Sequence, residues 1–160
     1  MAAPLSDREQ AELQATITPG WIVVTDSSQE PLGQVMLDGR HVLAADEPSA
    51  VGGRDSGPSP YELLLMALGS CTSMTLRMYA DRKQLALERV IVRLKHAKVH
   101  AADCVNCESK SAMIDRIDRH IELFGNLDAA QRTRLMEIAE MCPVHRTLHS
   151  EVLIKTELAA

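Results

Sequence analysis

The sequence predicts an α+β fold in one domain, because strand patterns occur in runs and two long helical patterns interrupt them. The chain has 160 residues, a length that suits one domain with a sizeable hydrophobic core. Neither an internal repeat nor a linker divides the chain. We therefore expect residues 1–160 to form a single domain.

The first two elements are a short helix and a strand. Residues 7–16 fit an amphipathic helix that ends before Pro19 and Gly20, so residues 1–20 are expected to form a peripheral helical segment. Residues 21–25 are rich in β-branched side chains and predict a strand.

A hairpin and a loop follow. Residues 34–37 and 41–44 flank the dipeptide Asp38-Gly39, and Asp-Gly between apolar runs is a strong hairpin signal. Residues 46–57 contain glycine-rich turns and show no periodicity. They predict a loop that leads into the longest helix.

That helix begins at Ser59 and is expected to run to residue 82 or 83. Ser59 as N-cap, Pro60 at the first helical position and Glu62 at the third form a capping box. Small and apolar residues share one face at three- and four-residue spacing: Leu63, Ala67, Ser70, Cys71, Met74 and Met78. Gly69 and Ser70 would allow another backbone to approach the helix closely.

Two further strands are expected after this helix. Residues 89–95 alternate between apolar and charged side chains and predict a strand that continues to residue 100. Residues 112–124 alternate in a similar way. Their position after a strand and before Gly125-Asn126 favours a second strand over a helix.

The C-terminal part predicts a helix, a further turn and a last strand. Asp128 caps a helix over residues 129–141, which Pro143 stops or kinks. Residues 144–149 fit one further helical turn. Residues 151–157 alternate and are expected to close the sheet.

Composition excludes several classes of partner. The net charge is −5 with both signs interspersed, so no basic stripe points to nucleic acid. No apolar run predicts a membrane span, and residues 1–8 lack the pattern of a signal peptide. We therefore expect a cytoplasmic protein. In that reducing compartment the four cysteines would be thiols, metal ligands or a transient disulfide.

Two of these cysteines are the most informative residues of the chain. Cys71 lies inside the long apolar helix, and Cys142 lies before Pro143, where a helix must end. Free cysteine is often plain core filling. Two cysteines can instead meet in the fold, with one attacking a substrate and the other resolving the product. A reactive Cys71 needs a nearby cation, because apolar burial alone raises the pKa of a thiol.

A carboxylate on the same helix is a candidate partner for that cation. Glu62 precedes Cys71 by nine residues, about 13–14 Å along the helix axis, so its side chain cannot bond the thiol directly. It could hold a guanidinium that reaches the thiol. It is equally a good capping residue.

A second group of thiols resembles half of a zinc site. Cys104 and Cys107 follow His96 and His100. On one strand the two histidines would lie about 13 Å apart, too far to share an ion. No second cysteine pair completes four ligands, so we expect two free thiols on a surface turn, and neither a metal nor a cofactor.

Two motifs in a fixed order resemble the OsmC/Ohr family of thiol peroxidases. They are GPSPYELLL with ALGSCT, at residues 57–65 and 67–72, and Cys142-Pro143-Val144 before a closing strand. The resemblance runs from about residue 41 to the C-terminus and is nearest to the OsmC-like branch. It implies an obligate, intertwined homodimer, with antiparallel sheets wrapped around long central helices and two active sites at the subunit interface.

The resemblance also implies roles for individual residues. Cys71 matches the peroxidatic cysteine of the family and Cys142 the resolving cysteine. The family activates its thiolate with an arginine and with a glutamate that directly follows the helix-opening proline. Here Tyr61 holds that place and Glu62 comes one residue later, rotated by about 100° around the helix.

Two arginines are candidates for the activating cation. Arg54 lies in the loop just before the helix, and Arg40 lies in the hairpin. Neither is part of a clear family motif. The candidate catalytic set is therefore Cys71 and Cys142 with Glu62 and Arg54.

The leading functional hypothesis is a peroxidase that reduces organic hydroperoxides with thiols. Cys71 would form a sulfenic acid, Cys142 would convert it into a disulfide, and an external dithiol would reset the site. No metal, flavin or haem is required. The alternative is a non-catalytic dimeric protein that binds a small apolar ligand, in which Cys71 is merely buried.

Overall fold

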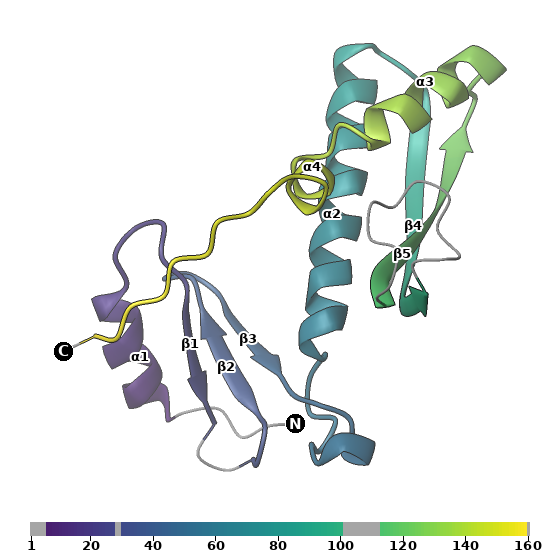
Figure 1. The fold of residues 1–160 in the computed structure, drawn as a ribbon. Helices are drawn as coiled ribbons and strands as arrows, with labels where there is room; N and C mark the ends of the chain where they lie inside the picture. The colour runs from purple at the N-terminus through teal and green to yellow at the C-terminus, as the bar shows by residue number, and fades with distance from the viewer. Residues whose placement is uncertain (1–5, 28–29, 101–112, 160) are drawn as a thin grey trace. The chain divides into compact units, whose positions relative to one another are not determined.

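A computed structural model describes residues 6–27, 30–100 and 113–159 of the chain, and the side chains of Asp7 and Gln10 are not described. These residues form helices and antiparallel sheets, so the α+β prediction is confirmed (Figure 1). The chain folds into two compact units, residues 1–64 and residues 65–160.

The first unit contains one helix and a three-stranded antiparallel sheet of order β1-β2-β3. Its elements are α1 (Asp7–Thr16), β1 (Val23–Asp26), β2 (Gln34–Leu37) and β3 (Val42–Ala45). All four lie within two residues of the predicted bounds. The predicted hairpin joins β2 and β3, with Met36 opposite Leu43 and Gly39 at a φ of +86° in its turn, a conformation that favours glycine.

The loop after β3 is irregular, as predicted, but it is organised around one buried carboxylate. It contains a 3-10 turn, η1 (Ser49–Val51). Asp46 is 2% exposed and accepts hydrogen bonds from the backbone N–H groups of Glu47, Arg54 and Ser56 and from the Ser56 hydroxyl. Desolvation raises the pKa of Asp46, but these four bonds outweigh it and lower that pKa to about 2.

The second unit is built on a long helix and a long hairpin (Figure 1). Helix α2 (Pro60–Arg82) starts in the first unit and continues through the second. The other elements are β4 (Leu87–His100), β5 (Met113–Gly125), α3 (Ala129–Ala139) and α4 (Pro143–Leu148). Strands β4 and β5 pair antiparallel along their whole length.

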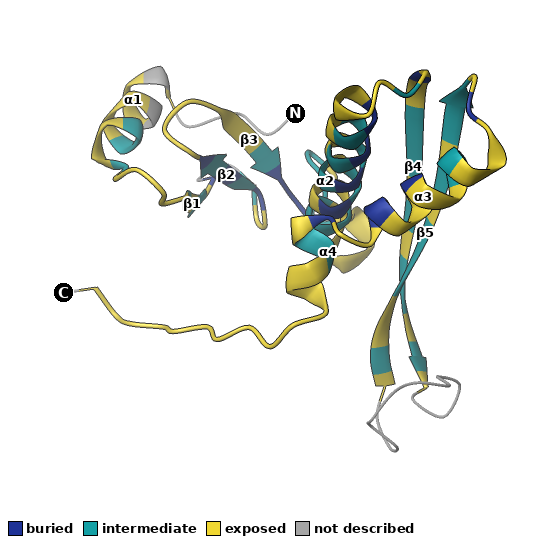
Figure 2. Cartoon of the chain, turned by 90° about the horizontal axis from the view of Figure 1, so that it is seen from above, coloured by how far each residue is buried: buried dark blue, intermediate teal, exposed yellow. Residues whose placement is uncertain are grey.

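Helix α2 begins as its capping residues predict. The Glu62 carboxylate accepts hydrogen bonds from the backbone N–H and the hydroxyl of Ser59. The buried face differs from the one singled out by spacing, because Met74 and Met78 are 64% and 72% exposed. The buried residues of α2 are Leu68, Thr72, Leu76 and Ala80, and the buried side of this helix is turned towards the hairpin and α3 (Figure 2). Both sets have helical spacing, so periodicity alone could not choose between them.

Among the described residues, α2 is also the helix with the length and apolar composition of a membrane span. Core helices of soluble proteins pass the same test, so the match is weak evidence. In this chain Leu76 and Ala80 of α2 are completely buried within the second unit's core.

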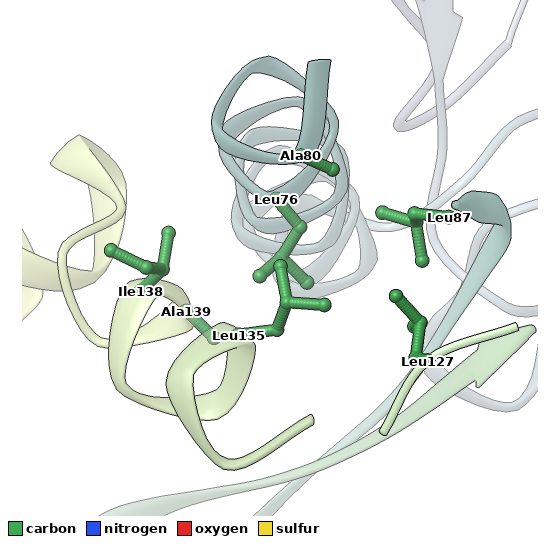
Figure 3. Close-up of a cluster of buried hydrophobic side chains, with 7 residues drawn as sticks. All are labelled: Leu76, Ala80, Leu87, Leu127, Leu135, Ile138 and Ala139. Carbon is green, nitrogen blue, oxygen red and sulfur yellow. The ribbon is translucent and has the colours of Figure 1, made fainter. Parts of the chain in front are cut away.

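The core of the second unit lies where α2, α3 and the ends of β4 and β5 meet. Figure 3 shows Leu76 of α2 against Leu135 of α3, with Leu87 and Leu127 on the other side of the cluster. The partly buried side chains of Val90, Ile121 and Leu123 pack against it from the hairpin. Gly69 lets α2 approach this hairpin, because a Cβ atom there would lie 2.9 Å from Leu94 Cδ1.

The C-terminal part differs from the prediction at two places. Helix α3 ends at Ala139, two residues before its predicted end, and Pro143 is the first residue of the separate helix α4, a position where its missing N–H costs nothing. Residues 151–159, predicted to hold a closing strand, have no regular structure and are exposed throughout. A strand needs an edge to pair with, and no described strand of this chain pairs with the segment.

Candidate functional site

The structure brings Cys71 and Cys142 into hydrogen-bonding contact. Cys71 lies on α2 and is partly exposed, whereas Cys142 is the N-cap residue of α4 and is completely buried. Both cysteines are free thiols. Residues 71 positions apart in the chain therefore form one two-sulfur site, which lies entirely in the second unit.

Local structure explains how Cys142 reaches α2. Helix α3 packs through Leu135, Ile138 and Ala139 onto the core, and the Cys142 N–H bonds the carbonyl of Ala139. Pro143 fixes its φ near the helical value and starts α4. Cys142 is therefore the N-cap residue between the end of α3 and the start of α4, and its side chain is completely buried.

The surroundings of the two sulfurs are unequal. Burial raises the pKa of Cys71, and its hydrogen bond to Cys142 raises it further. Hydrogen bonds from the Val144 N–H and the Thr75 side chain lower this pKa, but they do not cancel the rise. Burial also raises the pKa of Cys142, but hydrogen bonds from Cys71, the His145 N–H, Thr72 and the Val144 N–H lower it below the ordinary value. These hydrogen bonds therefore favour a thiolate on Cys142 over a thiolate on Cys71.

An arginine that the sequence reasoning missed completes this site. Arg119 lies on β5 with its side chain 10% exposed. Its Nη1 donates to Thr72 Oγ1 at 3.1 Å and to the Ala139 carbonyl at 3.3 Å, and its Nη2 donates to Glu140 Oε1 at 2.7 Å. Thr72 is also a hydrogen-bond partner of Cys142, so one hydroxyl lies between the guanidinium and the buried sulfur.

A carboxylate and two histidines lie next to the guanidinium of Arg119. Glu140 Oε2 lies 3.0 Å from His145 Nε2, and the His145 ring stacks on His149 with 4.4 Å between centroids. Burial lowers the pKa of His145, and the nearby Arg119 and His149 lower it further against the opposing effect of Glu140. His145 is therefore mostly neutral near pH 7.

The other candidate site residues lie in the first unit and have their own partners there. Arg54 pairs with Glu30 at 2.8 Å, and Glu62 bonds Ser59 at the start of α2. Hydrogen bonds from Ser59 lower the pKa of Glu62. The Arg40 N–H donates to Asp38 in the hairpin turn. The roles of Arg54, Arg40 and Glu62 as activating residues therefore stay predictions.

The expected surface turn with Cys104 and Cys107 lies outside the described residues. His96, which precedes it, bonds Asp115 across the hairpin at 2.8 Å. Within the described ranges, no group of three or more His, Cys, Asp or Glu residues has the arrangement of a metal site.

Comparisons with known proteins agree with this architecture. The model of one protein family, described as OsmC-like protein, matches residues 53–157. No curated protein sequence matches the chain. Several solved structures share its fold at low sequence identity.

Three of these structures illustrate the similarity. A protein of Psychrobacter arcticus 273-4, assigned to the osmotic stress induced and detoxification response, has a TM-score of 0.62 and 21% identity over 82% of this chain and 88% of its own. An OsmC like protein of Mycoplasma pneumoniae has a TM-score of 0.62 and 15% identity, with coverages of 81% and 86%. An organic hydroperoxide resistance protein OsmC of Legionella pneumophila has a TM-score of 0.58 and 17% identity, with coverages of 82% and 91%.

Proposed function

Because the chain belongs to the family of OsmC-like proteins, we propose that it is a thiol-dependent peroxidase that reduces organic hydroperoxides. The observation that carries this proposal is the contact between two free thiols, of which only Cys71 is accessible. Several proteins of similar fold are organic hydroperoxide resistance proteins. We place the protein in the cytoplasm, where dithiols can keep both cysteines reduced.

The first chemical step belongs to Cys71. Its proton passes to Cys142, which acts as the base, and the Cys71 thiolate attacks the distal oxygen of the hydroperoxide. The S–O bond forms as the O–O bond breaks, and the two electrons of the O–O bond leave with the alkoxide. The alkoxide takes from Cys142 the proton that Cys71 gave up and departs as an alcohol, which leaves Cys71 as a sulfenic acid and Cys142 again as a thiolate.

The second step belongs to Cys142. Its thiolate attacks the sulfenic sulfur, the S–S bond forms, and hydroxide leaves and is protonated to water. An external dithiol then reduces the disulfide by exchange and becomes a disulfide itself. One hydroperoxide and one dithiol are consumed in each cycle, and no metal or other cofactor takes part.

We further propose that the protein acts as a homodimer. Large apolar side chains on α2 and in the C-terminal segment are exposed in the single chain, among them Met66, Met74, Met78, Val152 and Ile154. The alternation of residues 151–157 suits a strand that pairs with a second copy. The dimer would bury more than about 2,000 Å² in total, the range of obligate interfaces. Sedimentation that finds a folded, active monomer at micromolar concentration would contradict it.

The homodimer also gives Arg54 and Glu62 a place in the mechanism. We propose that these two residues, with Arg40 as the other candidate cation, activate the Cys71 thiolate and that the cation comes from the second copy. Arg54→Gln would then slow the oxidation of Cys71, whereas Arg8→Gln, an exposed substitution in α1, would not. Equal oxidation rates in both variants would remove Arg54 from the mechanism.

A steady-state assay with cumene hydroperoxide and dithiothreitol tests the function. The proposal expects hydroperoxide consumption that depends on the dithiol and that Cys71→Ser abolishes. The alternative, a binding protein for a small apolar ligand, predicts no consumption and no change on Cys71→Ser. Hydroperoxide left intact by the reduced wild-type protein would refute the peroxidase.

A further inference from the structure

We propose that Arg119 is a positioning residue of the thiol site, which acts through the hydroxyl of Thr72 to stabilise a thiolate on Cys142. The inference rests on the proposed redox role of the Cys71–Cys142 pair, and it concerns a cation from the chain's own second unit. Three observations lead to it: the strand position of Arg119, its hydrogen bonds, and the charges around it.

Arg119 lies at a position of β5 where the alternation of the strand predicts an apolar side chain. In β5 it shares one face of the strand with Ile117 and Ile121, and it pairs in register with Leu94 of β4. Ile121 belongs to the shell of the core. A guanidinium at an inward position is costly to desolvate unless its donors are satisfied.

Three of its hydrogen bonds go to groups on two parts of the fold, Thr72 of α2 and the consecutive residues Ala139 and Glu140 at the end of α3. A surface ion pair with Glu140, which is 59% exposed, would need only Nη2. Nη1 instead points inward, to the Thr72 hydroxyl and the Ala139 carbonyl. The guanidinium thereby fixes α2 against the end of α3, three residues before Cys142.

The Thr72 hydroxyl can serve as a relay because it has one proton and two lone pairs. It accepts from Arg119 and donates to the Leu68 carbonyl at 2.8 Å. Cys142 is its other partner. When Cys142 loses its proton, the hydroxyl can turn its hydrogen to the sulfur while Arg119 still holds its oxygen. A donor that is itself hydrogen-bonded to a cation donates more strongly.

Near neutral pH, Arg119 is a more dependable cation beside Glu140 than His145 is. Glu140 bonds Arg119 through one carboxylate oxygen and His145 through the other. The ring of His145 also stacks on that of His149. The pKa of His145 lies below its ordinary value, whereas a guanidinium keeps its charge at every relevant pH.

The test follows thiolate absorbance in the ultraviolet as the pH is raised. The full-length protein carries Cys104→Ser and Cys107→Ser, so that only Cys71 and Cys142 titrate. Arg119→Gln should raise the pKa of the first ionisation by about one unit, a tenfold lower thiolate population at a given acidic pH. Arg119→Lys, which keeps the charge without the planar fork, should raise it by less.

Two further variants make the test decisive. Thr72→Val removes the hydroxyl with little change of volume and should raise the same pKa, and combining it with Arg119→Gln should add little, because both interrupt one chain of donors. Arg116→Gln is the matched control on β5, since Arg116 pairs with Asp118 at the surface, and it should leave the titration unchanged.

Folding is checked by circular dichroism. An unchanged titration in a folded Arg119→Gln or in Thr72→Val would overturn the proposal, as would full additivity of the two. Failure of the proposed peroxidase has a separate signature, because the titration needs no hydroperoxide. If the wild-type protein leaves cumene hydroperoxide intact while Arg119→Gln still shifts the titration, the proposed peroxidase function is refuted and the proposed role of Arg119 is supported.

Discussion

Cys71 and Cys142 differ in access and in hydrogen-bond donors, and this difference supports separate chemical roles. Cys142 is completely buried and has more hydrogen-bond donors to its sulfur than Cys71, which favours the thiolate form of Cys142. Cys71 is the sulfur that a substrate can reach. The pair thus combines an accessible thiol with a buried base one hydrogen bond away.

Substitution of each cysteine should separate these roles. Cys71→Ser should abolish hydroperoxide reduction, because a hydroxyl ionises far too weakly to replace a thiolate. Cys142→Ser should react once and then stop cycling, and its Cys71 should over-oxidise to the sulfinic acid. Mass spectrometry after peroxide treatment would detect that acid. Equal residual cycling in the two variants would contradict the assignment.

The order of ionisation should also be visible in these variants. With Cys104 and Cys107 replaced by serine, the thiol left in Cys71→Ser should ionise at lower pH than the thiol left in Cys142→Ser. The reason is that Cys142 keeps hydrogen bonds from the His145 N–H and Thr72. A titration of thiolate absorbance decides it, and the reverse order would show that the first charge rests on Cys71.

At this scale the sequence predicted the pair of sulfurs but not the groups around them. Cys71 and Cys142 stand in recognisable motifs, so their meeting could be anticipated. Arg119 could have been found from one signal, a charge at an inward position of an alternating strand. Its bonds to Thr72 and Glu140 depend on how β5, α2 and α3 pack, which local pattern does not contain.

At the scale of elements, Asp46 holds the loop before α2 in one shape. Its folded pKa of about 2 lies below the unfolded value of about 3.9. The stability that it contributes is therefore fully present above that unfolded value and is lost as the pH falls from there towards about 2. Both hydrogen bonds from Ser56 go to the same carboxylate oxygen of Asp46, and they are stronger when that carboxylate is charged.

Asp46→Asn should therefore lower the stability most near neutral pH and little near pH 2, because the amide replaces acceptor oxygen with a donor. Urea unfolding across this pH range would measure the difference, and hydrogen exchange should show faster opening at the Arg54 and Ser56 N–H groups. Asp55→Asn, in the same loop and without a side-chain bond to this group, is the control. A constant deficit at every pH would argue against the assignment to Asp46.

The helices and strands were predictable wherever a local signal sets their ends. The capping box at Ser59 and Glu62 placed the start of α2, and the Asp-Gly dipeptide placed the β2–β3 turn. The buried face of α2 was not predictable, because an apolar helix offers more than one stripe at the same spacing. The alternation of residues 151–157 is typical of a strand. A strand also needs the edge of another strand to pair with, and alternation in the sequence does not show whether such an edge is present.

At the scale of the whole molecule, the family match at residues 53–157 begins near the end of the first compact unit and covers most of the second. The thiol site and the main core cluster both lie in the second unit, one helical turn apart on α2 at Thr72 and Leu76. Site geometry and core packing should therefore be coupled. That the two units act together as one domain stays a prediction.

Leu76→Ala should lower the free energy of unfolding by about 2–5 kcal/mol, the range for completely buried leucines, since Leu76 is 0% exposed. Met136→Ala on the exposed side of α3 should change it by less than about 0.5 kcal/mol. Urea denaturation measures both values. Similar small losses in the two variants would mean that the cluster in Figure 3 does not hold the second unit together.

The most direct test of the redox pair is a single turnover. The reduced protein receives one equivalent of cumene hydroperoxide without dithiol, and its intact mass and peptide map are then measured. We predict a mass lower by two hydrogen atoms, one Cys71–Cys142 disulfide per protein and one molecule of alcohol released. Unchanged thiols with intact hydroperoxide, or a disulfide that excludes either of these cysteines, would contradict it.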